Sequence, residues 1–462
     1  MRRLLVANRG EIAVRIIRAA RDLGISTVAV HSTADAEALH VRLADTAVEI
    51  GPPQAAKSYL VVDAILAAAK ETGADAVHPG YGFLAERADF AAAVADAGLA
   101  FVGPEAAVIE RMGDKVAARE VARAAGVPTV PGTEGGIEDV GAAVAAAGEV
   151  GYPVMLKAAA GGGGRGIRVV DDEAALRTAF PQASREAAAA FGDGRMYLER
   201  FVRRARHVEV QVLGDGGDVV HLYERECSLQ RRRQKMVEEA VAPGIDAGTR
   251  EAMTAAAVAL CREVGYRSAG TVEFLVDVDA LGRNPGGGAS RGWFFIEMNT
   301  RIQVEHPTTE MVTGVDLVAE QLRIAAGEPL RLRQDAITAR GHALEFRVVA
   351  EDPDRDFLPA PGAIDRVVLP AGPWVRCDTW IEPGMRVPPF YDSLLAKVIV
   401  WGEDRETALR RSRRALAEFA VDGVPTTAGL FRELLDEPWF TAGKFHTGTL
   451  EQWLVDRSEA GP

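Results

Sequence analysis

One stretch of the sequence alternates polar and apolar side chains from Glu297 to Glu305. In an extended chain every second side chain lies on the same face, so this run would present its polar groups together. Those groups are Glu297, Asn299, Arg301, Gln303 and Glu305. An aromatic and aliphatic segment at 293–296 comes directly before the run. That order favours a buried strand that carries its polar face into a cleft, with a solvent-facing strand as the alternative.

The residue types in this run suit metal and anion chemistry. Glu297 and Asn299 offer the oxygen ligands that Mg²⁺ prefers, and Glu273 could supply a second carboxylate from a neighbouring strand. Arg301 could hold a planar oxyanion with its fork of donors. Glu305 then remains as a base. The run therefore predicts a site where a metal, an anion and a base lie close together.

A glycine-rich loop, Gly161–Gly166, stands between two strand-like segments. It fits G-x-G-x-x-G formally, but a β-like run at 167–170 follows it, whereas the dinucleotide fingerprint must open a helix. A Walker A loop is also excluded, because no Lys-Ser or Lys-Thr follows the last glycine. Glycines let backbone N–H groups approach phosphate oxygens closely. The loop predicts a flap over a triphosphate, with Lys157 adding a positive charge; the alternative is a flexible linker.

The segment 226–239 is dense in charge and contains Lys235. A solvated basic turn would account for such a composition. The functional interpretation is an anion site in which Lys235 binds a small carboxylate-like species. Both interpretations stay open from the residues alone.

The elements that must position these residues begin with a repeated strand–helix pattern in the first hundred residues. Strands are expected at 4–7, 27–30, 74–77 and 100–102, and a helix at 11–23. Strands separated by helices form parallel sheets, and ligands bind beyond the carboxyl ends of such strands. The segments Asn8–Gly10 and His78–Gly82 lie at those ends, either as parts of a binding site or as simple turns.

Beyond residue 128 the pattern becomes mixed. Strands are expected at 153–158, 167–170, 208–213, 270–278, 293–299 and 343–350. From about residue 356 the chain is β-rich, and a helix is expected at 405–420. The scaffold is therefore α/β at its start and α+β later.

Composition excludes some classes of partner. The 462 residues carry a net charge of −13 without a basic block, which argues against nucleic acid. No uncharged apolar stretch reaches the ~18 residues that a membrane span needs. The three cysteines are scattered and odd in number, as expected for buried thiols in a reducing compartment. We expect a cytoplasmic protein of about two to four domains, with no nucleic-acid or membrane partner.

Several motifs, taken in their order, resemble the biotin carboxylase family of the ATP-grasp superfamily. The resemblance covers nearly the whole chain, and the ordered set is far more specific than any one motif. The motifs are Ala7–Ala13, His78–Leu84, Met112–Lys115, Lys157–Gly166, Arg206–Glu209, Glu297–His306 and Ala350–Pro353. In two departures, Arg233 stands where several family members carry histidine, and the segment 279–292 is longer than usual. The composition of that segment predicts a surface hairpin loop.

The resemblance implies an α/β fold that becomes α+β in its later domains. A Rossmann-like parallel sheet would occupy 1–113, as the N-terminal biotin carboxylase domain. An ATP-grasp domain would span 114–326 and include a mobile glycine-rich lid at about 130–203. A β-rich C-terminal biotin carboxylase domain would cover 327–450.

The resemblance also implies roles for individual residues. ATP would contact Lys115, Lys157, Gly163, Gly164, Glu199, Arg200, Val202, His207, Gln230, Arg233 and Leu275, with Arg200 and Val202 over the adenine. Mg²⁺ or Mn²⁺ would be held by Glu273, Glu297 and Asn299. Bicarbonate would be bound by Lys235, Arg301, Gln303 and Val304, and biotin by Tyr81, Gly82 and Arg347. The catalytic residues would be Lys235, Arg301, Glu305 as the base that deprotonates bicarbonate, and Arg347 as the group that stabilises the biotin enolate.

A member of this family would convert ATP, bicarbonate and biotin into ADP, phosphate and N1-carboxybiotin by way of carboxyphosphate. Biotin would arrive on a biotin carboxyl carrier protein, which is either another chain or a further part of this one, because the sequence contains no Met-Lys-Met biotinylation motif. A carboxyltransferase on another chain and a homodimeric assembly are also implied, within an acyl-CoA or pyruvate carboxylase. The alternatives are another ATP-grasp ligase, which joins a carboxylate to an amine, and a non-catalytic scaffold subunit.

Overall fold

The computed structural model describes residues 1–159, 167–280 and 292–460 of the chain. Its architecture is mixed, with a parallel sheet near the N-terminus and a large antiparallel sheet beyond it, as expected from the sequence. The glycine loop with Gly163 and Gly164, and most of the hairpin loop expected at 279–292, lie outside the described residues.

The N-terminal unit is a five-stranded parallel sheet in the order β3-β2-β1-β4-β5. Its strands are β1 (Arg3–Val6), β2 (Ser26–Ser32), β3 (Thr46–Gly51), β4 (Ala76–His78) and β5 (Ala100–Phe101). Its helices are α1 (Gly10–Asp22), α2 (Leu39–Leu43), α3 (Val62–Thr72) and α4 (Ala88–Asp96). Side chains alternate along β1, so that Leu4 packs with α1 on one face and Leu5 with α3 and α4 on the other. Asn8 and Arg9 after β1, and Tyr81 and Gly82 after β4, line one cavity.

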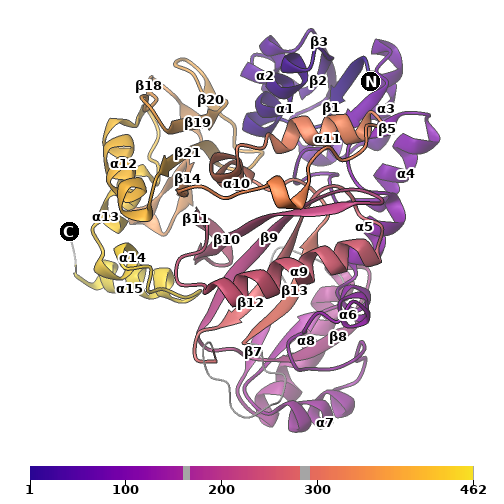
Figure 1. The fold of residues 1–462 in the computed structure, drawn as a ribbon, viewed down its shortest axis with the longest axis vertical. Coiled ribbons are helices and arrows are strands. Elements are labelled where there is room, and N and C mark those ends of the chain that lie inside the picture. The colour runs from indigo at the N-terminus through magenta and orange to yellow at the C-terminus, as the bar shows by residue number, and fades with distance from the viewer. Residues whose placement is uncertain (160–166, 281–291, 461–462) are drawn as a thin grey trace.

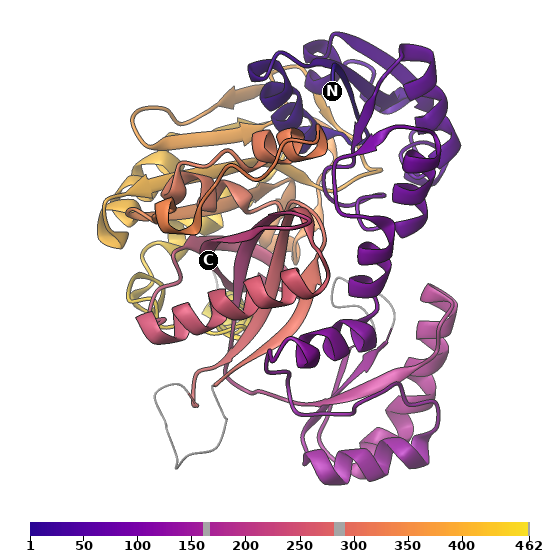
Figure 2. The ribbon, with the colours of Figure 1, turned by 45° about the vertical axis from the view of Figure 1, so that its right-hand side comes forward.

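A smaller antiparallel sheet, in the order β7-β6-β8, forms the lobe at the lower right of Figure 2. Its strands are β6 (Val154–Ala158), β7 (Arg168–Val170) and β8 (Met196–Arg200). The helices of this lobe are α7 (Val140–Val150) and α8 (Glu173–Phe191). Leu156, Leu198 and Phe180 share its core. The connection from the N-terminal unit runs through α5 (Ala106–Gly113) and α6 (Lys115–Ala124), so Lys115 lies at the junction.

The largest sheet has eight antiparallel strands in the order β13-β12-β9-β10-β11-β14-β21-β19. These are β9 (Ala205–Asp215), β10 (Val219–Arg231), β11 (Gln234–Ala240), β12 (Arg267–Asp277), β13 (Trp293–Asn299), β14 (His342–Val349), β19 (Val375–Thr379) and β21 (Leu394–Gly402). Helix α9 (Ala247–Glu263) lies along this sheet in Figure 1, and α10 (His306–Thr313) and α11 (Leu317–Ala325) connect β13 to β14. Because the sheet continues from β11 into β14, segments on both sides of residue 326 share it. The boundaries at 113 and 326, and the lid at about 130–203, remain predictions.

The C-terminal elements cover the β14–β21–β19 end of the large sheet (Figure 1). Three short ribbons pair β15 (Glu351–Asp352) with β16 (Leu358–Pro359), β17 (Gly362–Ala363) with β20 (Arg386–Val387), and β18 (Arg366–Val368) with β22 (Ala420–Asp422). The helices are α12 (Arg405–Glu418), α13 (Ala428–Leu434), α14 (Pro438–Thr441) and α15 (Thr449–Ala460). Helix α12 matches the helix expected at 405–420.

The alternating run from Glu297 to Glu305 is not one extended strand, so that prediction was wrong beyond Asn299. Strand β13 ends at Asn299, and Glu305 is already the N-cap residue of α10. Pro307 stands in the first turn of this helix, where its fixed φ and missing N–H are tolerated. The polar residues converge because the loop turns them into one cavity and not because a strand alternates.

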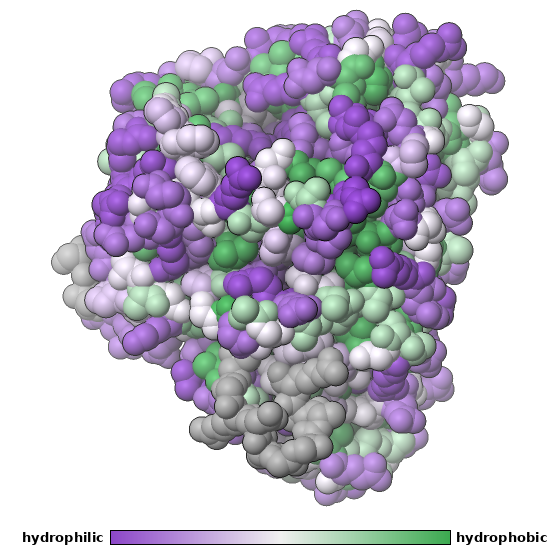
Figure 3. All heavy atoms as spheres, in the orientation of Figure 1, coloured by the Kyte–Doolittle hydropathy of each residue, from purple (hydrophilic) through white to green (hydrophobic). Residues whose placement is uncertain are grey.

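Two further expectations concern the surface and the thiols. Within residues 1–159, 167–280 and 292–460, no helix is long and apolar enough to cross a membrane. The face shown in Figure 3 mixes hydrophilic and hydrophobic residues. The three cysteines are free thiols, and Cys227 and Cys261 are buried.

Candidate active site

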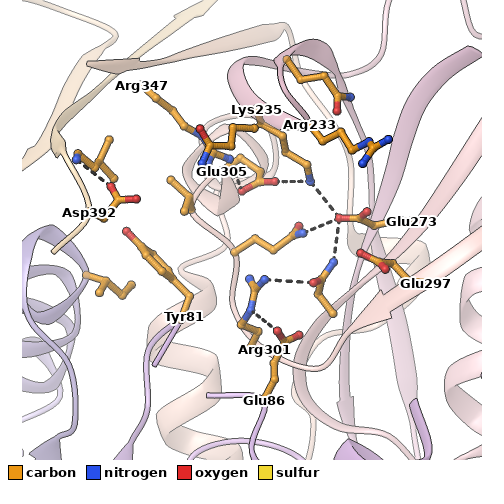
Figure 4. Close-up of a pocket in the computed structure, with 18 of the residues that line it drawn as sticks. Tyr81, Glu86, Arg233, Lys235, Glu273, Glu297, Arg301, Glu305, Arg347 and Asp392 are labelled. Atoms are coloured by element: carbon orange, nitrogen blue, oxygen red, sulfur yellow. Dashed lines mark hydrogen bonds and ion pairs between the residues drawn. The ribbon is translucent and has the colours of Figure 1, made fainter. Parts of the chain in front are cut away.

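A cavity of about 1300 Å³ lies where the N-terminal unit, the eight-stranded sheet and the C-terminal elements meet. Figure 4 shows side chains from its different walls pointing toward one another. The predicted site residues that line it are Tyr81, Gly82, Lys115, Lys157, His207, Gln230, Arg233, Lys235, Glu273, Leu275, Glu297, Asn299, Arg301, Gln303, Val304, Glu305 and Arg347. The structure therefore brings together residues from distant parts of the chain.

Three of the predicted ATP contacts do not line this cavity: Glu199, Arg200 and Val202. Glu199 is buried and forms ion pairs with Lys157 and Arg119, so it holds Lys157 in place. Arg200 lies 3.8 Å from Asp277, and Val202 is buried. Direct contact of these three residues with a nucleotide stays a prediction.

Lys235 on β11 is the centre of the charged cluster in Figure 4. Its Nζ lies 2.5 Å from Glu209, 3.0 Å from Glu273 and 2.7 Å from Glu305. An ammonium group has three donors, so each donor can reach one carboxylate. Burial alone would lower the pKa of Lys235, but Cys227 and the surrounding carboxylates raise it well above its usual range. Lys235 therefore stays charged, and a small anion could compete with the carboxylates for its donors.

Glu305 lies between two cations. Its Oε1 accepts a hydrogen bond from Lys235, and its Oε2 accepts one from Arg347 at 2.9 Å. Burial alone would raise the pKa of Glu305, but Lys235 and Arg347 hold it well below its usual range. Arg347, on β14, also lies 2.6 Å from Glu238, so two carboxylates fix its guanidinium. The Glu305 carboxylate is therefore ionised and able to accept a proton.

A buried arginine on β10, Arg225, connects this cluster to its surroundings. Arg225 is fully buried and donates to Glu209 and Gln211, each at 2.6 Å. It also donates to Gln303 at 2.7 Å. A guanidinium in this position fixes both the carboxylate that contacts Lys235 and the amide of Gln303.

Glu273 on β12 and Glu297 on β13 are direct partners in the antiparallel register. Like charges at such positions repel each other, so the pair favours a cation. Ammonium groups meet this need in the structure, since Lys115 lies 2.7 Å from Glu297 and Lys235 lies 3.0 Å from Glu273. Mg²⁺ typically takes one or two carboxylates and completes its shell with phosphates and water. The two carboxylates therefore fit Mg²⁺, and Mn²⁺ accepts the same oxygen ligands.

The third predicted metal ligand, Asn299, is oriented differently. Its Nδ2 donates to Glu273 at 2.8 Å, and its Oδ1 accepts from Arg301 at 3.1 Å. A metal ion binds the amide oxygen, which for Asn299 faces Arg301 in this structure. The carboxylates of Glu273 and Glu297 are the better placed ligands.

Replacing Glu297 with glutamine tests this metal site. We expect Glu297→Gln to weaken Mn²⁺ binding in the presence of ADP by at least about tenfold, because changes to groups around a ligand already cost about 10- to 100-fold. Electron paramagnetic resonance of free and bound Mn²⁺ measures this affinity. Glu86→Gln is the matched control, since Glu86 lies at the cavity but pairs with Arg301. Equal Mn²⁺ affinity in both variants would contradict the assignment.

The positively charged end of the cavity contains two lysines and a histidine. Lys115 is the first residue of α6, and Lys157 lies on β6. His207 on β9 contacts Glu273 at 2.7 Å. Burial alone would lower the pKa of His207, but Glu273 raises it above its usual value. Such a set can neutralise phosphate charge, which is the main requirement of phosphoryl transfer.

Tyr81 and Gly82 lie on another wall, in the turn after β4. Figure 4 shows Tyr81 and Asp392 together on this wall, on the same side as Arg347. The Tyr81 hydroxyl donates a hydrogen bond to Glu11. This wall leaves the guanidinium of Arg347 facing the cavity, next to Glu305.

Sequence reasoning assigned no role to several residues that line the site or hold it together: Glu11, Glu86, Glu209, Arg225, Asp392 and Lys397. Glu86 ion-pairs with Arg301 at 3.3 Å, and Lys397 donates to the Val304 carbonyl at 2.8 Å. One available signal was a charged residue inside an otherwise apolar strand, as in the segment Leu394–Gly402. A charge at such a position must have a buried partner.

Three family matches cover most of the chain. Residues 1–109 match "Biotin carboxylase, N-terminal domain", and residues 345–452 match "Biotin carboxylase C-terminal domain". Residues 114–333 match "Carbamoyl-phosphate synthase L chain, ATP binding domain". The middle match alone would suit other ATP-dependent ligases as well. The two flanking matches distinguish the biotin carboxylase family from those ligases.

Relatives and solved structures agree with these matches. The biotin carboxylase of Pseudomonas aeruginosa is 54% identical over 98% of this chain and 99% of its own. The structure of the Campylobacter jejuni biotin carboxylase–β-γ-ATP complex has a TM-score of 0.93 and 42% identity, over 98% of both chains. The biotin carboxylase domain dimer of Hydrogenobacter thermophilus 2-oxoglutarate carboxylase, with MgADP, ADP and bicarbonate, has a TM-score of 0.91 and 46% identity over 98% and 97%. This chain belongs to the biotin carboxylase family.

Proposed function

We propose that this chain uses ATP to activate bicarbonate and transfers the carboxyl group to N1 of biotin. The observation that carries the proposal is the meeting of Lys235, Glu305 and Arg347 at 2.7 and 2.9 Å, beside the paired carboxylates Glu273 and Glu297. One cavity therefore combines an anion site, a base, a guanidinium and a metal site.

In the first step, bicarbonate would replace carboxylate contacts of Lys235 and lie against Arg301, Gln303 and the backbone of Val304. Glu305 would take the proton of bicarbonate, and the resulting oxyanion would attack the γ-phosphorus of ATP. The bond from that phosphorus to ADP breaks, and carboxyphosphate forms. Lys115 and Lys157 would offset charge on the phosphates. When bound at Glu273 and Glu297, Mg²⁺ would supply further charge neutralisation for the phosphoryl transfer.

In the second step, carboxyphosphate would release CO₂ and phosphate inside the cavity. The released phosphate would take the proton of biotin N1, and N1 would form a bond to the carbon of CO₂. The negative charge that develops on the ureido oxygen would face the guanidinium of Arg347, in the manner of an oxyanion hole. Glu238 and Glu305 hold that guanidinium in place before the substrate arrives.

The proposal extends to the assembly. Biotin would be delivered by a biotin carboxyl carrier protein, and carboxybiotin would be used by a carboxyltransferase; relatives of this chain include a pyruvate carboxylase subunit. A homodimer is supported by the dimeric relative from Hydrogenobacter thermophilus. The cytoplasm is the proposed location.

Free biotin provides the test of this function. The chain, MgATP and bicarbonate are expected to release ADP faster when free biotin is added, with labelled carbon from bicarbonate appearing in carboxybiotin. Omitting bicarbonate is the control and should abolish the stimulation. If an amine stimulates ADP release and biotin does not, the alternative carboxylate–amine ligase is correct and the proposal is wrong. If neither acceptor nor bicarbonate changes ADP release, the scaffold alternative is favoured.

A further inference from the structure

We infer that the buried ammonium of Lys397 is a positioning group that connects the biotin wall of the cavity, formed by Tyr81 and Gly82, to its bicarbonate loop, residues 300–305. The inference rests on the proposed function and adds a coupling between its two substrate sites. Lys397 touches neither site directly, because its side chain is fully buried behind them. It would act through Val304 on one side and through Glu11 and Tyr81 on the other.

The contacts of Lys397 run in two directions. Its Nζ donates to the carbonyl oxygen of Val304 at 2.8 Å. The same Nζ lies 3.1 Å from Oε1 of Glu11 and 3.9 Å from Asp378. Burial alone would lower the pKa of Lys397, but Glu11, first among several carboxylates, raises it above its usual value. The group therefore keeps its charge and its donors.

The contact with Val304 acts on the bicarbonate loop. The Val304 carbonyl belongs to the peptide unit that leads into Glu305, and a peptide unit is planar. Holding that oxygen fixes the plane, so it also fixes the direction in which the chain enters Glu305 and α10. In the described structure, the loop from Thr300 to Glu305 has no strand partner to hold it in place. A buried hydrogen bond from a charged donor is a strong substitute.

The contact with Glu11 acts on the biotin wall. Glu11 lies in the first turn of α1, is buried, and accepts the hydrogen bond of the Tyr81 hydroxyl. Tyr81 itself lines the cavity. A continuous series of polar contacts therefore runs from Val304 through Lys397 and Glu11 to Tyr81. It joins the loop before α10, strand β21 and the N-terminal unit.

The position of Lys397 in the sheet supports this role. Lys397 on β21 is the direct register partner of Arg347 on β14. Two cations at such a position repel each other unless anions separate them. Arg347 is paired with Glu238 and Glu305, and Lys397 is paired with Glu11. The pairing leaves Arg347 at the cavity wall and Lys397 buried behind it.

The inference predicts an effect across the cavity. Tyr81→Phe keeps the ring but removes the hydroxyl that joins Glu11. We expect it to raise the KM for bicarbonate by about three- to tenfold, the equivalent of one hydrogen bond, although Tyr81 lies on the biotin wall. The matched control is Tyr391→Phe, which removes another hydroxyl at the cavity, bonded to Ser32 at 2.6 Å and to Pro53. That control should leave the KM for bicarbonate unchanged.

The measurement is biotin-stimulated ADP release by the full chain, with bicarbonate and free biotin titrated separately. Lys397→Met and Glu11→Gln should raise the KM values for both substrates. The double variant Tyr81→Phe with Lys397→Met should raise the KM for bicarbonate by less than the product of the two single-variant factors, since both changes act through one series of contacts. A merely structural lysine would give additive effects and leave the KM for bicarbonate unchanged in Tyr81→Phe. Circular dichroism shows whether each variant is folded.

The outcomes separate the inference from the proposed function. If the wild-type chain shows no biotin-stimulated ADP release, the proposed function itself fails. If the wild type is active but Tyr81→Phe changes only the KM for biotin, the coupling through Lys397 is wrong. Should Lys397→Met fail to fold, the pair Tyr81→Phe and Glu11→Gln provides the same test, because both variants break the series at other contacts.

Discussion

Glu305→Gln is expected to reduce biotin-dependent ADP release on the order of 10²–10³-fold while the fold is retained. Glutamine keeps the shape of the side chain but cannot take a proton, and only one of its two terminal atoms, the oxygen, can accept a hydrogen bond. One of the contacts at 2.7 and 2.9 Å therefore loses its acceptor, and the basic function is lost with it. Initial rates at saturating ATP, bicarbonate and biotin measure the effect.

The pH dependence of the wild type adds a second check on Glu305. Lys235 and Arg347 hold its pKa well below the usual value of about 4.3. The base is therefore already ionised above that pH, and its titration should not limit the rate between about pH 5 and 8.

Glu351→Gln is the matched control for Glu305→Gln, because Glu351 lies at the cavity but contacts Ser393. A Glu305→Gln rate within a few-fold of this control would refute the role of Glu305 as the base.

The second large effect concerns stability. We expect Arg225→Met to lower the free energy of unfolding by about 3–5 kcal/mol, because it leaves the buried carboxylate of Glu209 without its guanidinium. Arg225 is fully buried, as is its partner Glu209, and the contact between them is 2.6 Å. Methionine fills a similar volume but offers no donor. Urea denaturation, followed by tryptophan fluorescence, measures the change.

Two variants check the reason for this loss. Arg333→Met, at an exposed arginine paired with Asp335, should change stability by no more than about 0.5 kcal/mol. Adding Glu209→Gln to Arg225→Met should recover part of the loss, since the uncompensated charge is then removed. If Arg225→Met is as stable as Arg333→Met, the guanidinium is not needed to balance Glu209. If Glu209→Gln worsens the loss, charge compensation is not the cause.

The sequence by itself determined the class of fold and the chemical character of the site. Apolar strands separated by helices indicated the parallel sheet, because side-chain periodicity is a local property that survives in any tertiary context. Glu297 and Asn299 were recognisable because the buried aromatic segment of β13 leads directly into them. Motifs in a fixed order indicated the family, to which the chain belongs.

The tertiary structure alone decided which charges meet. Arg225 with Glu209 and Lys397 with Glu11 join residues on different elements, and no periodicity relates such positions. Alternation suggested a strand up to Glu305, whereas the chain leaves the sheet after Asn299 and begins a helix. Local patterns report which face of an element is buried, but they carry no information on the partner across the interface. A buried charge is stable only with a partner of opposite sign, so its place is determined when the whole chain has folded.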